Sequence, residues 1–396
     1  MMVGPSIAFF WLCLASLLYV YVLYPGLIFL IGRLFGRLHG EPSDPPPDGW
    51  PRISLLLAAY NEESVLVERL ENALAMDYPA DRFEIVVGSD GSVDGTAEVV
   101  GRFAGRGVRL LDFAERQGKA AVLNRAMPTL SGEIVLLSDA NTLIAPDAAR
   151  KLVRWFARPD VCCVCGKLVL TDPATGKNSD GLYWKYETFI KRSEARLGAL
   201  LGANGAIYAL RRDHYEPLPS GTIIDDFVIP LLSLLRRGGL IFYEPGAVAS
   251  EESAPDVAAE FRRRCRIGAG GFQCLALLWP LLDPRRGWLD FAFLSHKLLR
   301  WLGPFFLIGM IATNLSLATS GPTLWRWVMA AQAIFYAMSF VTLPGNSTLH
   351  RLLRLAAMFT SMNVALLVGF WGWLTGRWGG TWTPTARPVA ATGPGR

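Results

Sequence analysis

Three short polar segments of the chain each follow an apolar run and carry residues that can bind a charged ligand. They comprise residues 59–63, 88–96 and 138–142, and Asp90 and Asp139 lie in the last two. Carboxylates at the end of an apolar run can bind ribose or base hydroxyls, and their oxygens can hold a hard divalent cation. The glycines within residues 88–96 let a ligand approach the backbone closely. The segments therefore predict a polar binding site that accommodates a cation.

The apolar runs before these segments have the pattern of strands that are buried on both faces of a sheet. The predicted strands are residues 53–58, 83–87, 108–111 and 134–137, with helix-like stretches at 65–75 and 94–103 between them. This alternation predicts an α/β fold with a mostly parallel sheet. Ligands of such sheets bind outside the carboxyl ends of the strands, which is where the polar segments lie.

Several protein classes are excluded by what the sequence lacks. There is no G-x-x-x-x-G-K-[ST] loop and no G-x-G-x-x-G after the first predicted strand, so kinases, ATPases and dinucleotide oxidoreductases lose their usual support. The six cysteines have no metal-ligand spacing. Residues 161–165 instead predict a strand with buried, reduced thiols, which indicates the cytosol. The net charge of +5 is scattered and predicts no nucleic-acid partner.

The composition indicates a chain that is partly embedded in a membrane. Hydrophobic residues make up 52% of its 396 residues and charged residues 18%, whereas a soluble domain usually carries about 25% charged residues. Four uncharged stretches are long enough to cross a bilayer. They are residues 7–31, 302–325, 327–343 and 355–373. We therefore predict an integral membrane protein of the inner or plasma membrane.

Basic residues predict its orientation, because Lys and Arg in short loops stay cytoplasmic. Arg33 and Arg37 follow the first stretch, and Arg351 and Arg354 lie between the third and fourth. With the N-terminus outside, the central domain and both basic loops are cytoplasmic. The basic residues after the fourth stretch then lie outside, against the rule.

The chain divides into six predicted regions. Five prolines between residues 41 and 51 predict a stiff linker, and the arginines within 257–301 predict helices that lie in the membrane interface. The regions are an N-terminal anchor at 1–40, the linker at 41–51, an α/β domain at 52–256, interfacial amphipathic helices at 257–301, three transmembrane helices at 302–376 and a flexible tail at 377–396.

Six motifs, in this order, resemble glycosyltransferase family 2. They are AAYNEE at 58–63, SDGSVDGT at 89–96, GKA at 118–120, SDANT at 138–142, GANGAIYA at 202–209 and DD at 225–226. The flanking apolar stretches resemble its membrane-embedded branch, which includes poly-N-acetylglucosamine, hyaluronan, chitin and cellulose synthases. The resemblance covers about residues 51–272. It implies a GT-A fold, a nucleotide-diphospho-sugar donor (usually a UDP-sugar) and transfer with inversion at the anomeric carbon.

The resemblance also assigns the reacting groups. Asp226 matches the general base that inversion requires on the acceptor hydroxyl, and Asp225 replaces the usual Glu and orients it. The alternative is that the two acids cap a helix that begins near Phe227. Asp139 matches the first metal-binding acid of an Asp-x-Asp, and Asn141 stands in place of the second. The implied cofactor is Mg²⁺ or Mn²⁺, and the alternative is a hydrogen-bonded turn at the end of a strand.

Other matches concern the two substrates. For the donor, Asp90 matches the nucleotide-binding acid, Tyr60 and Glu62 flank the base and ribose, and Lys119 meets the nucleotide or its phosphate as a point charge. A plain solvated lysine is the alternative for Lys119, and an Asx turn is equally compatible with Asp94. For the acceptor, the matching segment is Gly202, Ala203, Asn204 and Gly205, with a tight turn as its alternative.

The largest departure from the family follows the base. Processive members carry Gln-x-x-Arg-Trp, whereas this chain has Arg263 in the Gln place, Arg266 in the Arg place and Ile267 in the Trp place. Arg266 retains the implied contact with the diphosphate, but Ile267 cannot stack on an acceptor sugar. A basic patch that binds anionic lipid is the alternative for these arginines.

The leading hypothesis is a membrane-bound glycosyltransferase that builds a surface polysaccharide or glycolipid, in contact with the bilayer and with polysaccharide-export partner proteins. One alternative is transfer of a single sugar to a lipid-linked acceptor. Another is a degenerate, non-catalytic subunit of a polysaccharide-export complex. Product length distinguishes the first two, and an Asp226→Asn protein that still supports polymer formation in cells would favour the last.

Overall fold

The computed structural model describes residues 3–37, 40–172, 175, 177–178, 181–253, 256–341 and 347–379. These residues form two compact units. We call one the sheet unit, made of the described parts of residues 40–188 and 200–260. The other is the helical unit, made of the described parts of residues 3–37, 189–199 and 261–378.

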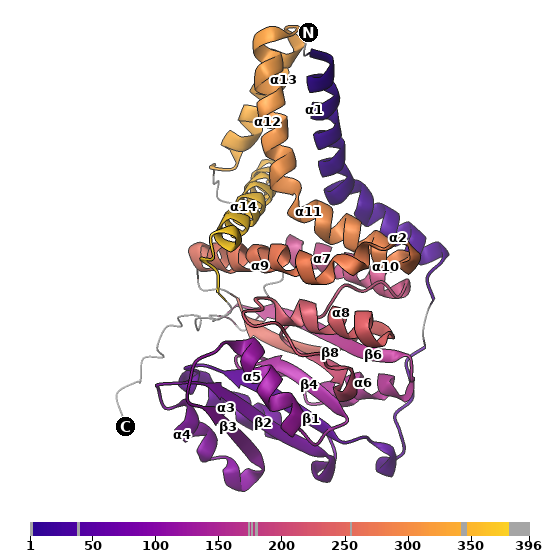
Figure 1. Ribbon diagram of the computed structural model, residues 1–396, viewed down its shortest axis with the longest axis vertical. Helices are drawn as coiled ribbons and strands as arrows, with labels where there is room; N and C mark the ends of the chain where they lie inside the picture. Colours follow the sequence, from indigo (N-terminus) through magenta and orange to yellow (C-terminus); the bar gives the residue numbers. More distant parts are fainter. Residues whose placement is uncertain are drawn as a thin grey trace. The chain divides into compact units, whose positions relative to one another are not determined.

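The sheet unit is built on one sheet with the strand order β3-β2-β1-β4-β7-β6-β8-β5. The strands are β1 (Ile53–Ala59), β2 (Phe83–Asp90), β3 (Val108–Phe113), β4 (Ile134–Asp139), β5 (Leu143–Ile144), β6 (Val161–Thr171), β7 (Tyr208–Arg211) and β8 (Leu240–Glu252). The first four in this order lie side by side and are parallel (Figure 1). The predicted α/β fold with a mostly parallel sheet is confirmed, and each of its four predicted strands is present.

Register explains why the polar segments meet. Ala58 of β1 pairs with Asp139 of β4, and the next residue, Ala59, pairs with Ser89 of β2. All seven residues of β1 are buried, so its apolar side chains fix this register from both faces of the sheet. The carboxyl ends of β1, β2 and β4 therefore lie at one level of the sheet edge.

The second half of the sheet mixes directions. β7 is antiparallel to β4 and β6, β6 is parallel to β8 with two register shifts, and β5 is antiparallel to β8. The helices of the sheet unit include α3 (Glu63–Leu74), α4 (Thr96–Gly101), α5 (Lys119–Ala126), α6 (Ala148–Val153) and α8 (Asp225–Arg237). Leu66 and Leu70 of α3 join Leu55 and Leu57 of β1 in a single apolar core.

The cysteines give a direct test of this packing. All six are free and buried, and burial raises the pKa of Cys162 to about 12 and that of Cys163 well above its usual range. Only the thiolate reacts readily, so at pH 8 we expect a maleimide to label almost no thiol in the native protein and all six after denaturation in SDS. Rapid labelling of Cys162, Cys163 or Cys165 in the native protein would contradict the packing of β6.

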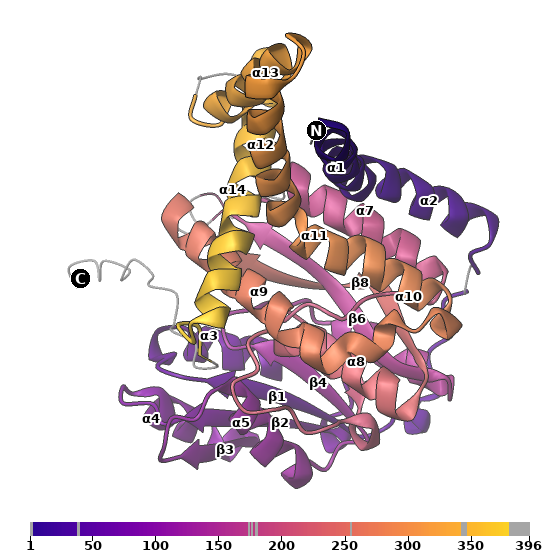
Figure 2. The same ribbon diagram turned by 45° about the horizontal axis from the view of Figure 1, so that its top comes forward.

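The helical unit contains a long N-terminal helix, formed by α1 (Val3–Leu18), a π-helical turn (Tyr19–Leu23) and α2 (Tyr24–Leu34). α1 packs along α12 (Gly303–Ser320), as Figure 2 shows, through Phe10, Leu17 and Leu317. The unit also holds most of α9 (Val257–Leu278), a bent helix from Trp288 to Trp301, α13 (Leu324–Met338) and α14 (Thr348–Leu374).

Among the described residues, four helices are long and apolar enough to cross a membrane: Gly4–Leu34, Val257–Leu282, Gly303–Ser320 and Thr348–Leu374. The chain is therefore a membrane protein by its helices, although two stretches differ from expectation. The stretch predicted at 327–343 forms α13, whose 15 residues span about 22 Å, less than the roughly 30 Å of a hydrocarbon core. Residues 257–282, predicted to lie in the interface, have the length to span, and an apolar window remains because their arginines gather toward one end.

A buried polar cluster joins three helices of the helical unit. The hydroxyl of Tyr24 donates to Oε1 of Glu194 at 2.8 Å, and Nδ1 of His296 lies 2.7 Å from the same oxygen. All three side chains are almost fully buried. Glu194 lies in α7 (Leu182–Arg196) and His296 in a π-helical segment (Phe293–Leu298). Polar pairing of this kind fixes the register of helices that are otherwise held by apolar contacts.

Candidate active site

A lysine stands between two carboxylates at the carboxyl ends of the parallel strands. Nζ of Lys119 lies 2.7 Å from Oδ1 of Asp139 and 3.0 Å from Oδ2 of Asp225. Burial alone would lower the pKa of Lys119, but attraction to Asp139, Asp225 and Asp226 outweighs it and raises the pKa above its usual range. The ammonium is therefore charged at neutral pH. The solvated-lysine alternative is wrong, because Lys119 is largely buried and ion-paired. Sequence reasoning did not foresee this arrangement.

Asp90 holds the loop that immediately precedes Lys119. The carboxylate of Asp90 is almost fully buried, and its two oxygens accept hydrogen bonds from the backbone N–H groups of Gln117 (2.8 Å) and Gly118 (2.9 Å). Gly118 has φ +93° and immediately precedes α5, a conformation that favours glycine. The structure thus uses the Asp90 carboxylate to hold the loop before Lys119, and its contact with a nucleotide stays a prediction.

Asp225 and Asp226 occupy the first turn of α8. The residue before the helix is Ile224, and no side chain caps it, so the two acids do not cap a helix that begins near Phe227. Acidic groups are stabilised in this position by the helix dipole. Oδ1 of Asp226 accepts from the N–H of Phe227 at 3.0 Å, which orients the carboxylate that we predict to be the base.

The loop at 202–205 links the two acidic segments. The N–H of Ala203 donates to the carbonyl of Asp226, and the N–H of Asp139 donates to the carbonyl of Gly205, each at 3.0 Å. A Cβ at position 205 would lie 2.5 Å from Oδ2 of Asp139. Only glycine fits at this position without moving the carboxylate, so the loop sets the distance between the two acids.

Within the same loop, Asn204 is used internally. Its Nδ2 donates to the carbonyl of Gly166 in β6 at 2.8 Å, and its Oδ1 accepts from the N–H of Ile207 at 3.4 Å. Gly202 has φ +77°, and a Cβ there would lie 2.8 Å from the Phe227 ring. These contacts give the turn a structural explanation. Acceptor binding by Gly202, Ala203, Asn204 and Gly205 stays a prediction.

Asp139 and Asn141 offer oxygen atoms to the cation that we predict at this site. Nδ2 of Asn141 donates to Oε1 of Glu251 at 3.0 Å, which fixes the amide plane, and the close approach of Gly205 holds the Asp139 carboxylate in place. Among the described residues, no three His, Cys, Asp or Glu side chains form a metal site by themselves. The donor set is therefore the hard-oxygen type that suits Mg²⁺ or Mn²⁺.

The first polar segment is tied to the second by backbone contacts. The N–H of Glu62 donates to Oγ1 of Thr96 at 2.9 Å, and the Asp94 carboxylate accepts from the N–H of Glu63 and of Thr96. The contact with Thr96 forms the Asx turn that the sequence allows at Asp94. The guanidinium of Arg116 lies 3.7 Å from the centre of the Tyr60 ring. Sequence reasoning missed Arg116, because no motif marks a cation–π partner.

Arg266 lies in α9, in the helical unit, whereas the other predicted site residues lie in the sheet unit. It is partly buried, and the neighbouring Ile267 is 41% exposed. Its contact with a diphosphate stays a prediction.

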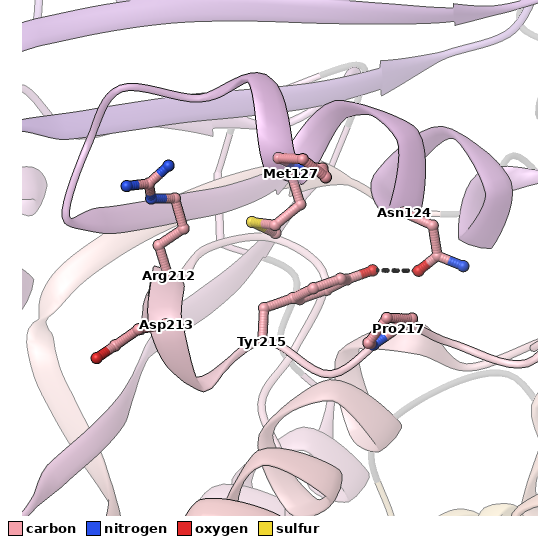
Figure 3. Close-up of a pocket in the computed structure, with 7 residues that line it drawn as sticks. Asn124, Met127, Arg212, Asp213, Tyr215 and Pro217 are labelled. Carbon is pink, nitrogen blue, oxygen red and sulfur yellow. Dashed lines mark hydrogen bonds between the residues drawn. The ribbon is translucent and has the colours of Figure 1, made fainter.

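A hollow of about 360 Å³ in the sheet unit lies beside the C-terminal end of α5, which begins at Lys119 (Figure 3). Its lining includes Asn124, whose Oδ1 accepts from the Tyr215 hydroxyl (2.7 Å) and the Leu218 N–H (2.8 Å). Nδ2 of Asn124 donates to the Leu218 carbonyl at 2.9 Å. The side chain thus holds residues 215–218 against α5.

We expect Asn124→Ala to lower the free energy of unfolding by about 1–3 kcal/mol, because buried partners lose their hydrogen bonds. Thermal unfolding followed by thiol exposure measures this loss. Gln117→Ala removes an exposed amide and serves as the neutral control. An Asn124→Ala protein as stable as the Gln117→Ala protein would contradict the role of this side chain.

Comparison with known proteins places this geometry in a class. The mannosyltransferase PcManGT from Pyrobaculum calidifontis, solved in complex with GDP-Man and Mn²⁺, superposes with a TM-score of 0.71 at 22% identity, over 94% of this chain and 99% of that chain. The sheet unit accordingly has the GT-A fold of glycosyltransferases. Residues 54–218 match the family model "Glycosyl transferase family 2", and the chain carries a domain of that family, as the motifs implied.

Curated relatives of this domain are polysaccharide synthases. The chain is 27% identical over 242 residues to the poly-beta-1,6-N-acetyl-D-glucosamine synthase of Staphylococcus epidermidis, and 28% identical over 230 residues to that of Staphylococcus aureus. These matches cover 59% and 56% of this chain, and 58% and 55% of the relatives' own lengths. The similarity therefore concerns little more than half of each protein.

Proposed function

We propose that this protein is a membrane-bound, inverting glycosyltransferase that moves a sugar from a nucleotide-diphospho-sugar to a polysaccharide or glycolipid acceptor. The observation that carries the proposal is the pair of ion pairs that Lys119 makes with Asp139 and Asp225 at the carboxyl ends of the strands, with Asp226 next in the chain. These ion pairs lie in a chain with a family 2 domain and long apolar helices. The positions of the basic residues support a cytoplasmic catalytic domain.

In the proposed reaction, Asp226 accepts the proton of the acceptor hydroxyl. The acceptor oxygen then bonds to the anomeric carbon while the bond from that carbon to the diphosphate breaks, and the nucleoside diphosphate leaves with the electron pair. Asp225 and Lys119 hold Asp226 and Asp139 in place beside the reacting sugar. A divalent cation held by Asp139 and Asn141 would neutralise charge on the leaving diphosphate.

Two donors are suggested by the relatives. The name of the curated relatives points to N-acetylglucosamine, which supports our expectation of a UDP-sugar, whereas the fold neighbour was solved with GDP-Man. The same relatives support a growing polysaccharide as acceptor, and export proteins as partners stay a prediction. Ile267, which offers no aromatic ring for stacking, favours the second candidate, transfer of one sugar to a lipid-linked acceptor.

A donor panel tests the proposal. Protein purified in detergent is given UDP-, GDP- and dTDP-sugars with and without Mn²⁺ or Mg²⁺, and released nucleoside diphosphate is measured beside an Asp226→Asn control. Metal-dependent turnover of one donor, lost in the control, is the expected result, and product length then separates polymer synthesis from single transfer. A protein that neither binds nor turns over any donor would overturn the proposal in favour of a non-catalytic subunit.

A further inference from the structure

A buried arginine beneath the site is not accounted for by the proposed reaction. Arg69 lies in α3 and is 1% exposed. Among the described residues no carboxylate forms a salt bridge with it, and its Nε has no hydrogen-bond partner. Burying a charge without an ion pair is costly, so packing alone gives no reason for an arginine at this position.

The guanidinium nevertheless stays charged. Burial lowers its pKa to about 10, and attraction to Asp139 opposes that change. A positive charge therefore stands behind the Asp139 carboxylate at neutral pH, without touching it.

One side of Arg69 reaches the end of β4. Its Nη2 donates to Oγ of Ser138 at 3.2 Å, and that hydroxyl donates to the carbonyl of Ala206 at 2.6 Å. Ser138 immediately precedes Asp139, and Ala206 immediately follows Gly205. This chain of hydrogen bonds therefore connects the metal-binding carboxylate to the loop that approaches it.

The other side of Arg69 reaches the strand after the turn. Its Nη1 donates to Oδ1 of Asn72 at 3.2 Å. The Asn72 amide exchanges two hydrogen bonds with the backbone of Ile144, each at 2.9 Å. The turn at residues 139–142 is thus held before its first residue, through Ser138, and after its last, through Ile144.

We propose that Arg69 is a positioning residue for the turn that carries Asp139 and Asn141. The inference rests on the proposed function for the identity of the ligand. The hold of Arg69 on the turn, however, is a property of the protein without ligand and can be measured separately.

Hydrogen–deuterium exchange of the ligand-free protein makes that measurement. In Arg69→Met we expect the amides of residues 139–144 to exchange about 5- to 150-fold faster than in wild type, because the buried partners of Arg69 lose their hydrogen bonds and the turn opens more easily. Arg154→Met is the matched control, because Arg154 is also a mostly buried arginine of the sheet unit but pairs with Glu244 at 3.1 Å. We expect exchange at 139–144 to be unchanged in that control.

Steady-state kinetics then measure how the loss of Arg69 affects sugar transfer. With the donor that wild type turns over, Arg69→Met is expected to lower kcat/KM about 10- to 100-fold, and Arg69→Lys, which keeps the charge, to recover part of the loss. If Arg69→Met does not fold, Ser138→Ala removes the same link with a smaller change and is expected to speed exchange at 139–144. Exchange at wild-type rates in both variants, or equal effects in Arg154→Met, would overturn the inference. Absence of turnover in wild type would instead refute only the proposed function.

Discussion

Asp226→Asn is expected to lower kcat for sugar transfer by about 10²–10⁴-fold, the usual effect of removing a general base. An amide cannot accept the proton of the acceptor hydroxyl, but its oxygen can still accept from the N–H of Phe227, as Asp226 does at 3.0 Å. The first turn of α8 should therefore persist, with the donor KM and the thermal stability near those of wild type. Release of nucleoside diphosphate under saturating donor measures the change.

Two further variants sharpen this test. Asp81→Asn changes an exposed acid outside the site and should leave kcat as in wild type. Asp225→Asn weakens the ion pair with Lys119, so we expect a smaller loss than in Asp226→Asn. A protein with Asn at 226 that retains more than about a tenth of the wild-type rate would show that another group removes the proton.

Gly205→Ala is the second change with a large expected effect. Its Cβ would lie 2.5 Å from Oδ2 of Asp139, closer than non-bonded atoms approach, so the carboxylate must move. Displacement of a reacting group by about 1 Å can cost roughly 10²-fold in rate. We expect kcat/KM to fall by about that factor and the Mn²⁺ concentration for half-maximal activity to rise.

Gly101→Ala is the control for this substitution. A Cβ at position 101 has no neighbouring atom within 4 Å, and alanine favours the helical conformation found there. This variant should match wild type in kinetics and in stability. If Gly205→Ala behaves in the same way, then Asp139 does not need its present position, and its predicted role with the cation is wrong.

The parallel half of the fold could be predicted from sequence because its strands are continuous apolar runs. In the second half of the sheet, which mixes directions, only residues 161–165 of β6 could be predicted. β5 has only two residues and β7 only four, and β8 contains Glu244, Pro245 and Gly246 within its length. Such segments carry no clear period, and their pairing is decided by contacts between residues far apart in the chain.

The candidate site shows the same division. Motifs located Asp139, Asp225, Asp226 and Lys119. No local pattern indicated that the lysine lies between the carboxylates of Asp139 and Asp225. Arg69 was missed for a different reason. A single arginine in an amphipathic helix is usually solvent-exposed, and only the three-dimensional structure reveals that this one is buried beneath Ser138.

The ion pairs of Lys119 also determine what the site offers to an arriving ligand. Lys119 pairs with Asp139 and Asp225 and is also attracted to Asp226, and Arg69 adds a second positive charge near Asp139, so carboxylates still outnumber cations around the site. A divalent cation balances that excess, whereas a nucleoside diphosphate alone would increase the repulsion. Because the Lys119 ammonium already contacts Asp139, an incoming metal cation must compete with it for that carboxylate. This charge balance favours the donor that arrives as its metal complex over either component by itself.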